Sequence, residues 1–213
     1  MNKNQHIHNL LNRFPQLNSV ENAIVLSWKT IIETYENGGK LLLCGNGGSA
    51  ADADHLAGEL MKGFEKNRPL NQEIKENLSK ISAERGKLLA EKLQHGLPAI
   101  SLTSHSALVL AIANDIDYES IFAQQVIGYG NANDVLIGFS CSGNSQNVID
   151  AMITAKAKGL KTIAFTGKTG GRLKAFSDIL INVPETNISR AQELHVPIYH
   201  TLCRIIEEHF FEK

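Results

Sequence analysis

The chain has 213 residues, of which 43% are hydrophobic and 20% are charged, and its formal net charge is −1. This length and apolar content allow a sizeable core, which favours one α/β domain, and the near-neutral charge disfavours direct binding to nucleic acid. Cys44, Cys141 and Cys203 are odd in number and lack CxxC spacing, so we expect neither a disulfide framework nor a thiolate zinc site.

The N-terminus begins with a polar segment, Met1-Asn2-Lys3-Asn4-Gln5-His6, which has no apolar core of a signal peptide. No uninterrupted apolar stretch reaches the length needed to cross a bilayer. We therefore expect a soluble protein of the reducing cytoplasm with no membrane partner.

Helical and β-rich segments alternate along most of the chain. A helix is expected over residues 20–37, and a long amphipathic helix over residues 191–211, where Pro197 should kink the early turns. Strands are expected over residues 40–44, 99–103, 134–140, 161–166 and 178–183, and helices over residues 50–61, 107–114, 147–158 and 172–176. This alternation predicts a parallel sheet with right-handed crossovers, whose ligand lies at the carboxyl ends of the strands.

Residues 64–97 interrupt this pattern with a charged stretch. Its apolar residues fall near helical spacing and are interrupted by Gly86; they are Ile74, Leu78, Ile81, Leu88, Leu89 and Leu93. We interpret the stretch as an inserted helical hairpin or one broken helix. The alternative is a flexible lid without fixed structure, because a connection this long inside a compact domain is either functional or disordered.

Two of the expected strands run into loops that suit a phosphate group. One loop is Gly45-Asn46-Gly47-Gly48-Ser49, and the other is Ser140-Cys141-Ser142-Gly143-Asn144-Ser145. Free N–H groups and the helix dipole favour an anion where such a loop opens a helix. Helix capping needs only one of the three serines, so the second loop favours an anion site over a simple cap.

The first loop also matches the dinucleotide fingerprint. That fingerprint requires an acidic residue about 20 positions further on, after a second strand, and this chain has a charged insertion there. We therefore expect no nucleotide cofactor. A tight strand-to-helix turn without a ligand stays open as an alternative.

Two pairs of polar side chains indicate chemistry. His55 and Glu59 are four residues apart, Gln192 and His200 are eight apart, and each spacing places both side chains on one helix face. His55 and Glu59 lie about one turn beyond the first loop, where such a pair can share a metal or act as a base and its orienting group. A surface pair worth about 0.2–0.5 kcal/mol is the alternative.

These motifs, in this order, resemble the sugar-isomerase (SIS) domain family over nearly the whole chain. The resemblance rests on both loops, on His55 and Glu59, and on Gln192-Glu193-x-His195 with His200, and it extends to Asn114-Asp115 and residues 166–171. It implies one domain over residues 1–213, with an N-terminal helix, a five-stranded parallel sheet flanked by helices, and an atypical helical insertion at about residues 65–97. It also implies a homotetramer with active sites where subunits meet, in agreement with the excess apolar surface of the first and last expected helices.

The resemblance further implies the roles of individual residues. Glu59 and His200 would be the catalytic base and acid. A zinc ion would be held by His55, Glu59, Gln192 and His200. The substrate would be contacted by Asn46, Gly47, Ser49, Asp115, Ser140, Cys141, Ser142, Ser145 and Gln192, with the serines on the phosphate. Cys141 replaces a usual Thr, and Ser189 replaces a frequent Asp, which bears on the exact sugar.

The implied reaction interconverts a ketose phosphate and an aldose phosphate through an enediol, as in the conversion of sedoheptulose 7-phosphate to D-glycero-manno-heptose 7-phosphate. Glu59 would take the proton from carbon, and His200 would move the hydroxyl proton or protonate the other carbon. The alternatives are an isomerase of another phosphosugar and a non-catalytic module that senses sugar phosphates or binds a protein. Retention of Glu59, Gln192 and His200 argues against the non-catalytic role.

Overall fold

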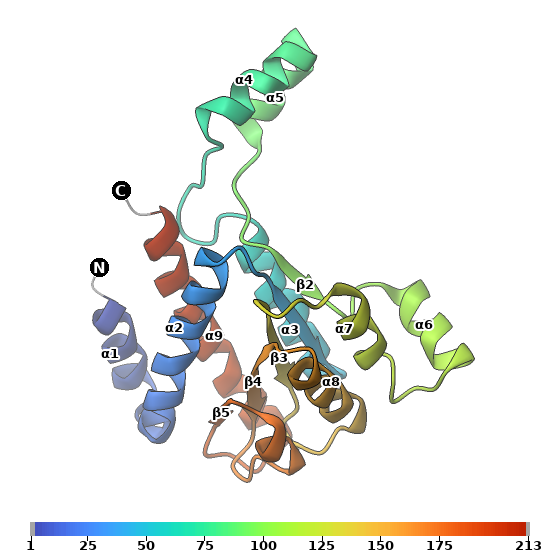
Figure 1. The fold of residues 1–213 in the computed structure, drawn as a ribbon. Helices are drawn as coiled ribbons and strands as arrows, with labels where there is room; N and C mark the ends of the chain where they lie inside the picture. The colour runs from blue at the N-terminus through green and yellow to red at the C-terminus, as the bar shows by residue number, and fades with distance from the viewer. Residues whose placement is uncertain (1–2, 212–213) are drawn as a thin grey trace.

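The computed structural model describes residues 3–211, which form a parallel sheet covered by helices (Figure 1). The strands are β1 (Leu41–Gly45), β2 (Ala99–Ser101), β3 (Val135–Phe139), β4 (Lys161–Thr166) and β5 (Ile179–Asn182). Their order is β2-β1-β3-β4-β5, and each neighbouring pair is parallel. The expected five-stranded parallel sheet is confirmed.

The sheet separates two hydrophobic cores. Leu41 and Leu43 of β1 lie in one core, while Leu42 and Cys44 lie in the other, because successive side chains of a strand point to opposite faces. The first core also contains α2 (Glu21–Glu36), α3 (Gly48–Met61) and α9 (Ile188–Phe211). The second contains α7 (Ala123–Tyr129) and α8 (Gln146–Ala157). Burial on both faces explains why β1 and β3 are continuous apolar runs.

The expected helix at residues 20–37 is preceded by one that we did not predict, α1 (Lys3–Arg13). It lies against α9 and α2 and is followed by the short 3-10 helix η1 (Pro15–Val20) (Figure 1). Ile7, Leu10 and Leu17 of this segment are buried in the first core. The apolar surface of α2 and α9 that we took as a sign of an oligomer is therefore mostly covered within the chain. Among their large apolar side chains, Leu26 and Ile188 are still more than half exposed.

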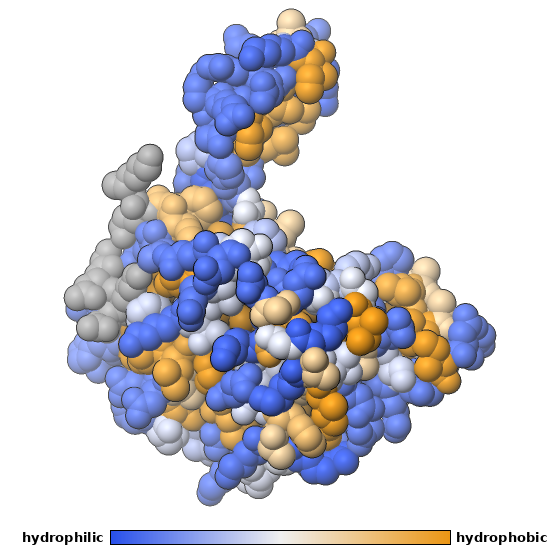
Figure 2. Space-filling view, viewed as in Figure 1, coloured by the Kyte–Doolittle hydropathy of each residue, from blue (hydrophilic) through white to orange (hydrophobic). Residues whose placement is uncertain are grey.

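Exposed apolar side chains gather instead at the other end of the molecule, on α6 (Ser106–Asp115), on the segment after it and on α7. Leu110, Ile116, Tyr118 and Ile127 are between 52% and 68% exposed. Figure 2 shows hydrophobic atoms over this part of the surface. Any association between copies of this chain has more apolar area to bury here than on α2 or α9.

The insertion is a helical hairpin that projects from the body of the molecule (Figure 1). Its helices are α4 (Gln72–Ile81) and α5 (Ala83–Lys92), and they pack against each other. The break between them lies at Ser82. Our expectation that Gly86 interrupts the helix was wrong, because Gly86 lies inside α5, where a Cβ atom would overlap the carbonyl of Leu78. Glycine is thus required by the close approach of the two helices.

Apart from α7, which we did not predict, the remaining elements agree with the expected ones to within a few residues. Residues 172–176 form a 3-10 helix, η2 (Arg172–Phe176), and α9 continues without interruption through Pro197. Between residues 3 and 211, we find no helix with the length and apolar character that crossing a membrane requires.

Candidate active site

The two predicted phosphate loops meet at the carboxyl ends of the neighbouring strands β1 and β3. Asn46, directly after β1, and Asn147, in the first turn of α8, exchange two side-chain hydrogen bonds of 2.8 and 3.0 Å. Asn147 is only 2% exposed. This amide pair holds together two loops that lie about a hundred residues apart in the sequence.

The geometry of the first loop requires a glycine at Gly47, and Gly48 leaves room for a neighbouring side chain. Gly47 precedes α3 with φ of +56°, a conformation that side-chain-bearing residues rarely adopt. At Gly48 a Cβ atom would lie 2.5 Å from Nε2 of Gln192. The absence of a side chain therefore lets Gln192, in the second turn of α9, rest against the first turn of α3. Ser189, which we noted as a departure from the family, is exposed at the start of α9 and donates to Asn187.

The hydroxyl groups of the two loops converge. Ser140 Oγ lies 3.0 Å from Ser145 Oγ, and Ser49 Oγ lies 3.9 Å from Sγ of Cys141. Ser49 and Ser140 are buried, and Ser142 Oγ accepts a 3.1 Å hydrogen bond from Asn144 N–H. The side chain of Ser145 makes no capping hydrogen bond, although this residue precedes α8. Helix capping therefore does not account for Ser145.

Cys141 is the weakest donor of this group. Its thiol is half-buried, and burial raises its pKa, so the sulfur stays protonated and neutral. A neutral thiol donates a weaker hydrogen bond than the threonine hydroxyl usual in the family. The loop keeps its shape through contact with the segment after β4, because Gly143, at φ of +66°, packs directly against the backbone of Gly170 and Gly171.

His55, Glu59 and His200 are brought together by the packing of α3 against α9. His55 Nε2 lies 3.1 Å from Glu59 Oε1 and 3.4 Å from His200 Nε2. Burial, followed by the electrostatic influence of the His55 ring and of the Arg204 guanidinium, lowers the pKa of His200. His200 is therefore a neutral ring at pH 7, able to accept a proton. The other oxygen of Glu59, Oε2, lies 3.2 Å from Nζ of Lys62.

Two distances between donor atoms of these three residues are compatible with a zinc ion. In a tetrahedral site with bonds of about 2.0–2.1 Å, neighbouring ligand atoms are roughly 3.3–3.4 Å apart. The distances from His55 Nε2 to the other two residues, 3.1 and 3.4 Å, are close to that spacing. In the described part of the chain, however, no three His, Cys, Asp or Glu side chains already surround one metal position. Gln192 rests at Gly48 instead.

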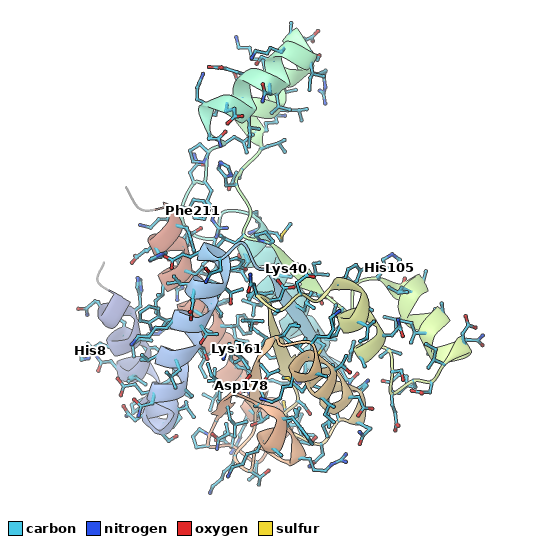
Figure 3. All side chains as sticks on the ribbon, viewed as in Figure 1. His8, Lys40, His105, Lys161, Asp178 and Phe211 are labelled. Carbon is cyan, nitrogen blue, oxygen red and sulfur yellow. The ribbon has the colours of Figure 1, made fainter. Side chains whose placement is uncertain are left out.

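Sequence reasoning missed an ion pair that anchors this site. Arg68 and Glu207 are fully buried, with Nε and Oε1 2.8 Å apart. Arg68 also donates to the backbone carbonyls of Leu60, at 2.6 Å, and Glu59, at 3.2 Å. Its guanidinium lies 4.8 Å from the ring of Phe211, which marks the end of α9 beside the base of the hairpin in Figure 3. The pair thus joins the end of α3 to the end of α9.

The same carboxylate fixes the chain that leads into the hairpin. Glu207 accepts hydrogen bonds of 2.8, 2.9 and 3.0 Å from the backbone N–H groups of Phe64, Glu65 and Lys66. The ring of Phe64 lies 5.3 Å from that of His200. Arg68 is one charged residue within a charged stretch, so the sequence gives no signal that this ion pair is buried.

Asp115 is the one predicted site residue that the fold places apart. It is exposed at the end of α6, where its Oδ1 accepts a 2.8 Å hydrogen bond from Asn114, and α6 projects from the body (Figure 1). The hydroxyl of Tyr118, just after α6, lies 3.5 Å from Asn46 Oδ1. The expectation that Asp115 contacts the sugar therefore has no support within a single chain.

A cavity of about 680 Å³ opens beside His200, between α1 and α9. Its walls include Arg13 of α1, Glu193 and Arg204 of α9, and Glu65. The site is thus open to solvent on this side, and the chemical groups at its rim carry both signs of charge.

Comparison with known proteins agrees with this geometry. Residues 5–89 and 80–167 match the model of the SIS domain. A phosphoheptose isomerase from Helicobacter pylori (strain P12) is 42% identical over 197 residues, which cover 92% of this chain and 89% of that protein. The structures of phosphoheptose isomerases from Neisseria gonorrhoeae and Francisella tularensis are 31% and 32% identical, have TM-scores of 0.73 and 0.76, and each match covers 96% of both chains. The chain therefore belongs to the SIS domain family, where it stands among the phosphoheptose isomerases.

Proposed function

We propose that this protein is an aldose–ketose isomerase that converts sedoheptulose 7-phosphate to D-glycero-manno-heptose 7-phosphate. The observation that carries the proposal is the placement of Glu59 and His200 beside His55, on two helices, α3 and α9, whose early turns meet at the first phosphate loop. Similarity to phosphoheptose isomerases over most of the chain supports the choice of substrate.

In the proposed mechanism, the substrate phosphate binds the hydroxyl groups of Ser49, Ser140 and Ser145 and the N–H groups at the starts of α3 and α8. Ser142, Cys141, Gly47 and Asn46 complete this end of the site. The phosphate fixes the sugar chain, so that the reacting carbons lie against α3 and α9.

The proton transfer is assigned to two side chains. Glu59 takes the proton from the carbon next to the carbonyl group, which produces an enediol, and returns it to the neighbouring carbon. His200, held neutral by the lowered pKa, moves the proton between the two oxygens. Because both residues lie within reach of His55, the base and the acid can act on the same substrate without a change of fold.

A zinc ion is proposed as a cofactor, held by His55, Glu59, Gln192 and His200. When bound, zinc would polarise the carbonyl group of the sugar. The set of two nitrogens and two oxygens suits zinc, and Gln192 would have to turn from Gly48 toward the other three ligands. No nucleotide cofactor is proposed.

Two further features are proposed. The first is a homotetramer with sites where subunits meet, supported by the exposed apolar side chains of α6 and α7 and by the position of Asp115, which a neighbouring copy could bring into use. The second is a cytoplasmic location, which the three free cysteines suit, because a reducing compartment keeps thiols free.

Product analysis by NMR tests the proposal. The protein would be incubated with sedoheptulose 7-phosphate and, separately, with a panel of ketose phosphates of five and six carbons. We expect conversion of the seven-carbon ketose to the manno-heptose 7-phosphate. Faster conversion of a shorter sugar would change the substrate, and saturable binding without any turnover would instead support a sugar-phosphate sensor.

A further inference from the structure

A line of buried polar groups reaches from the interior of the protein to His55. The hydroxyl of Tyr199 lies 3.0 Å from Nδ1 of His55 and 3.3 Å from Oδ1 of Asp52. Tyr199 is 1% exposed and Asp52 is 7% exposed, whereas the side chain of His55 is 45% exposed. Tyr199 therefore connects a carboxylate in the interior with a ring at the surface of the site.

The direction of these hydrogen bonds follows from the number of hydrogens. A phenol has a single hydrogen, and a carboxylate can only accept. Tyr199 therefore donates its hydroxyl hydrogen in a hydrogen bond to Asp52. The phenol oxygen is left to accept a hydrogen bond from the ring N–H of His55. His55 then carries its ring hydrogen on Nδ1, and Nε2 is left with a free electron pair.

We propose that Asp52 and Tyr199 are positioning residues that hold His55 in this tautomer. The proposal deepens the proposed function, because Nε2 is the atom that faces Glu59 and His200 at 3.1 and 3.4 Å. Histidines that bind metals commonly donate their other ring N–H to a fixed partner, which orients the ring and raises its basicity. Tyr199 takes this place for His55.

Within the site, Glu59 competes with Tyr199 for the ring hydrogen of His55. Glu59 Oε1, 3.1 Å from Nε2, would accept a hydrogen from that nitrogen if the ring carried one there. The electron pair of Nε2 would then be unavailable to a metal ion. Asp52 and Tyr199 oppose this state, because they offer the ring hydrogen a partner at the other nitrogen.

Packing keeps the tyrosine in place. Its ring lies edge-on to both histidine rings, with centroids 5.5 Å from His55 and 5.1 Å from His200. On its inner side, the ring meets Phe139 of β3 at 6.2 Å and 89°. A side chain held by three rings loses little further freedom when it forms its two hydrogen bonds, so the geometry at His55 is fixed in advance.

The test is nitrogen-15 NMR of the metal-free, substrate-free protein at about pH 9, where imidazole rings are neutral. The signals of His55 are assigned from their loss in His55→Gln. In the wild type we expect the hydrogen on Nδ1. In Asp52→Ala, Tyr199 loses its acceptor and donates to Nδ1, so the hydrogen of His55 should move to Nε2. In the nearly isosteric Tyr199→Phe, the hydrogen should move to Nε2 as well, toward Glu59.

Tyr35→Phe is the matched control, since the hydroxyl of Tyr35 donates to the carbonyl of Pro98 at 3.3 Å, away from His55. It should leave the tautomer unchanged. A hydrogen on Nε2 in the wild type, or one that stays on Nδ1 in both Asp52→Ala and Tyr199→Phe, overturns the proposal. Because neither metal nor substrate is present, this result is independent of the isomerase assay.

Zinc binding gives a second readout. Loss of such a supporting partner typically weakens metal binding about 10–100-fold, and we expect this change in Tyr199→Phe but not in Tyr35→Phe, measured by competition with a coloured chelator. Equal zinc affinity in wild type and Tyr199→Phe would overturn the proposal that Asp52 and Tyr199 keep the electron pair of Nε2 free for a metal ion.

Discussion

The guanidinium of Arg68 and the carboxylate of Glu207 form a fully buried ion pair, 2.8 Å apart, between residues that are far apart in the sequence. Glu207→Gln removes the charge that compensates Arg68 and weakens acceptance from three backbone N–H groups. We expect the free energy of unfolding to fall by about 3–5 kcal/mol, as measured by urea denaturation.

An exposed pair in the same region provides the control. Arg204 Nε lies 2.7 Å from Glu65 Oε1, and both side chains reach solvent. Glu65→Gln should lower stability by at most about 1 kcal/mol. Similar losses in the two variants would show that burial does not decide the value of the Arg68–Glu207 pair.

Glu59→Gln should lower turnover about 10²–10⁴-fold, because an amide cannot take a proton from carbon. The fold should be kept, since the amide is nearly the same size as the carboxylate and the backbone contact of Glu59 with Arg68 does not involve the side chain. Turnover is followed together with deuterium exchange at C1 of the sugar. Glu91→Gln, in the hairpin, is the matched control with expected wild-type activity, and near-normal exchange in Glu59→Gln would exclude this residue as the base.

Ser145→Ala should weaken binding of the phosphosugar by about 1.5–3 kcal/mol, the value of a hydrogen bond to a charged group. Stability should fall by only about 1 kcal/mol, because the side chain of Ser145 does not cap α8 and the variant loses one hydrogen bond, to Ser140. Calorimetry gives the affinity. Ser82→Ala is the matched control, since Ser82 also precedes a helix without a side-chain capping bond. Equal affinity in Ser145→Ala and Ser82→Ala would remove Ser145 from the phosphate site.

His195 should make the protein sensitive to acid. Burial lowers the pKa of His195 to about 4 from its ordinary value of 6.5. Its contribution to stability is therefore complete above pH 6.5 and is lost as the pH falls toward 4, a total on the order of 3 kcal/mol. Burial raises the pKa of Asp52 to about 6, so protonation of Asp52 below pH 6 favours the folded state and offsets part of this loss of stability.

The effect of His195 is isolated by comparison with His195→Phe, which keeps an aromatic ring between Phe139 and Phe165. In this variant the carbonyl oxygen of Thr166 still accepts a hydrogen bond from the backbone N–H of Val183, so it is not left without a partner. Urea denaturation at pH 7 and pH 4.5 should show a smaller loss of stability in His195→Phe than in the wild type. An equal loss in both proteins would assign the acid sensitivity to other groups.

Zinc, if it is held as proposed, should be removable by a chelator without unfolding, because the ligand set has no thiolates and both ligand helices are fixed by the hydrophobic core. Activity should disappear with the metal and return when zinc is added. Elemental analysis and circular dichroism accompany the assay. Full activity in protein shown to contain no metal would leave Glu59 and His200 as a metal-free pair.

The strands and the loops after them could be predicted from sequence because their signals are local. The apolar run before Gly45 and the glycines after it are enough to place β1 and the start of α3. The spacing of His55 and Glu59 likewise fixes their common face on one helix. These features depend on neighbours within a few residues, where periodicity and backbone preference are strong.

The features that could not be predicted depend on distant partners. The polar start of α1 concealed Ile7 and Leu10, which are buried only because α9 returns to cover them. Arg68 looks like any charge in a charged stretch until Glu207 is placed beside it. Gly86 resembles a helix breaker because its contact with Leu78 appears only once the hairpin has folded.

The base of the hairpin shows how this chain can carry its extra segment. Pro69 and Gln94 pair in an isolated antiparallel bridge, and His95 N–H donates to Arg68 O at 2.7 Å. The chain thus leaves and re-enters the body at nearly one point, about 5 Å wide. A segment whose two ends already touch can lengthen, shorten or diverge in sequence without altering the path of the chain on either side. A change in the length of residues 70–93 is consequently expected to leave Glu59 and His200 in register.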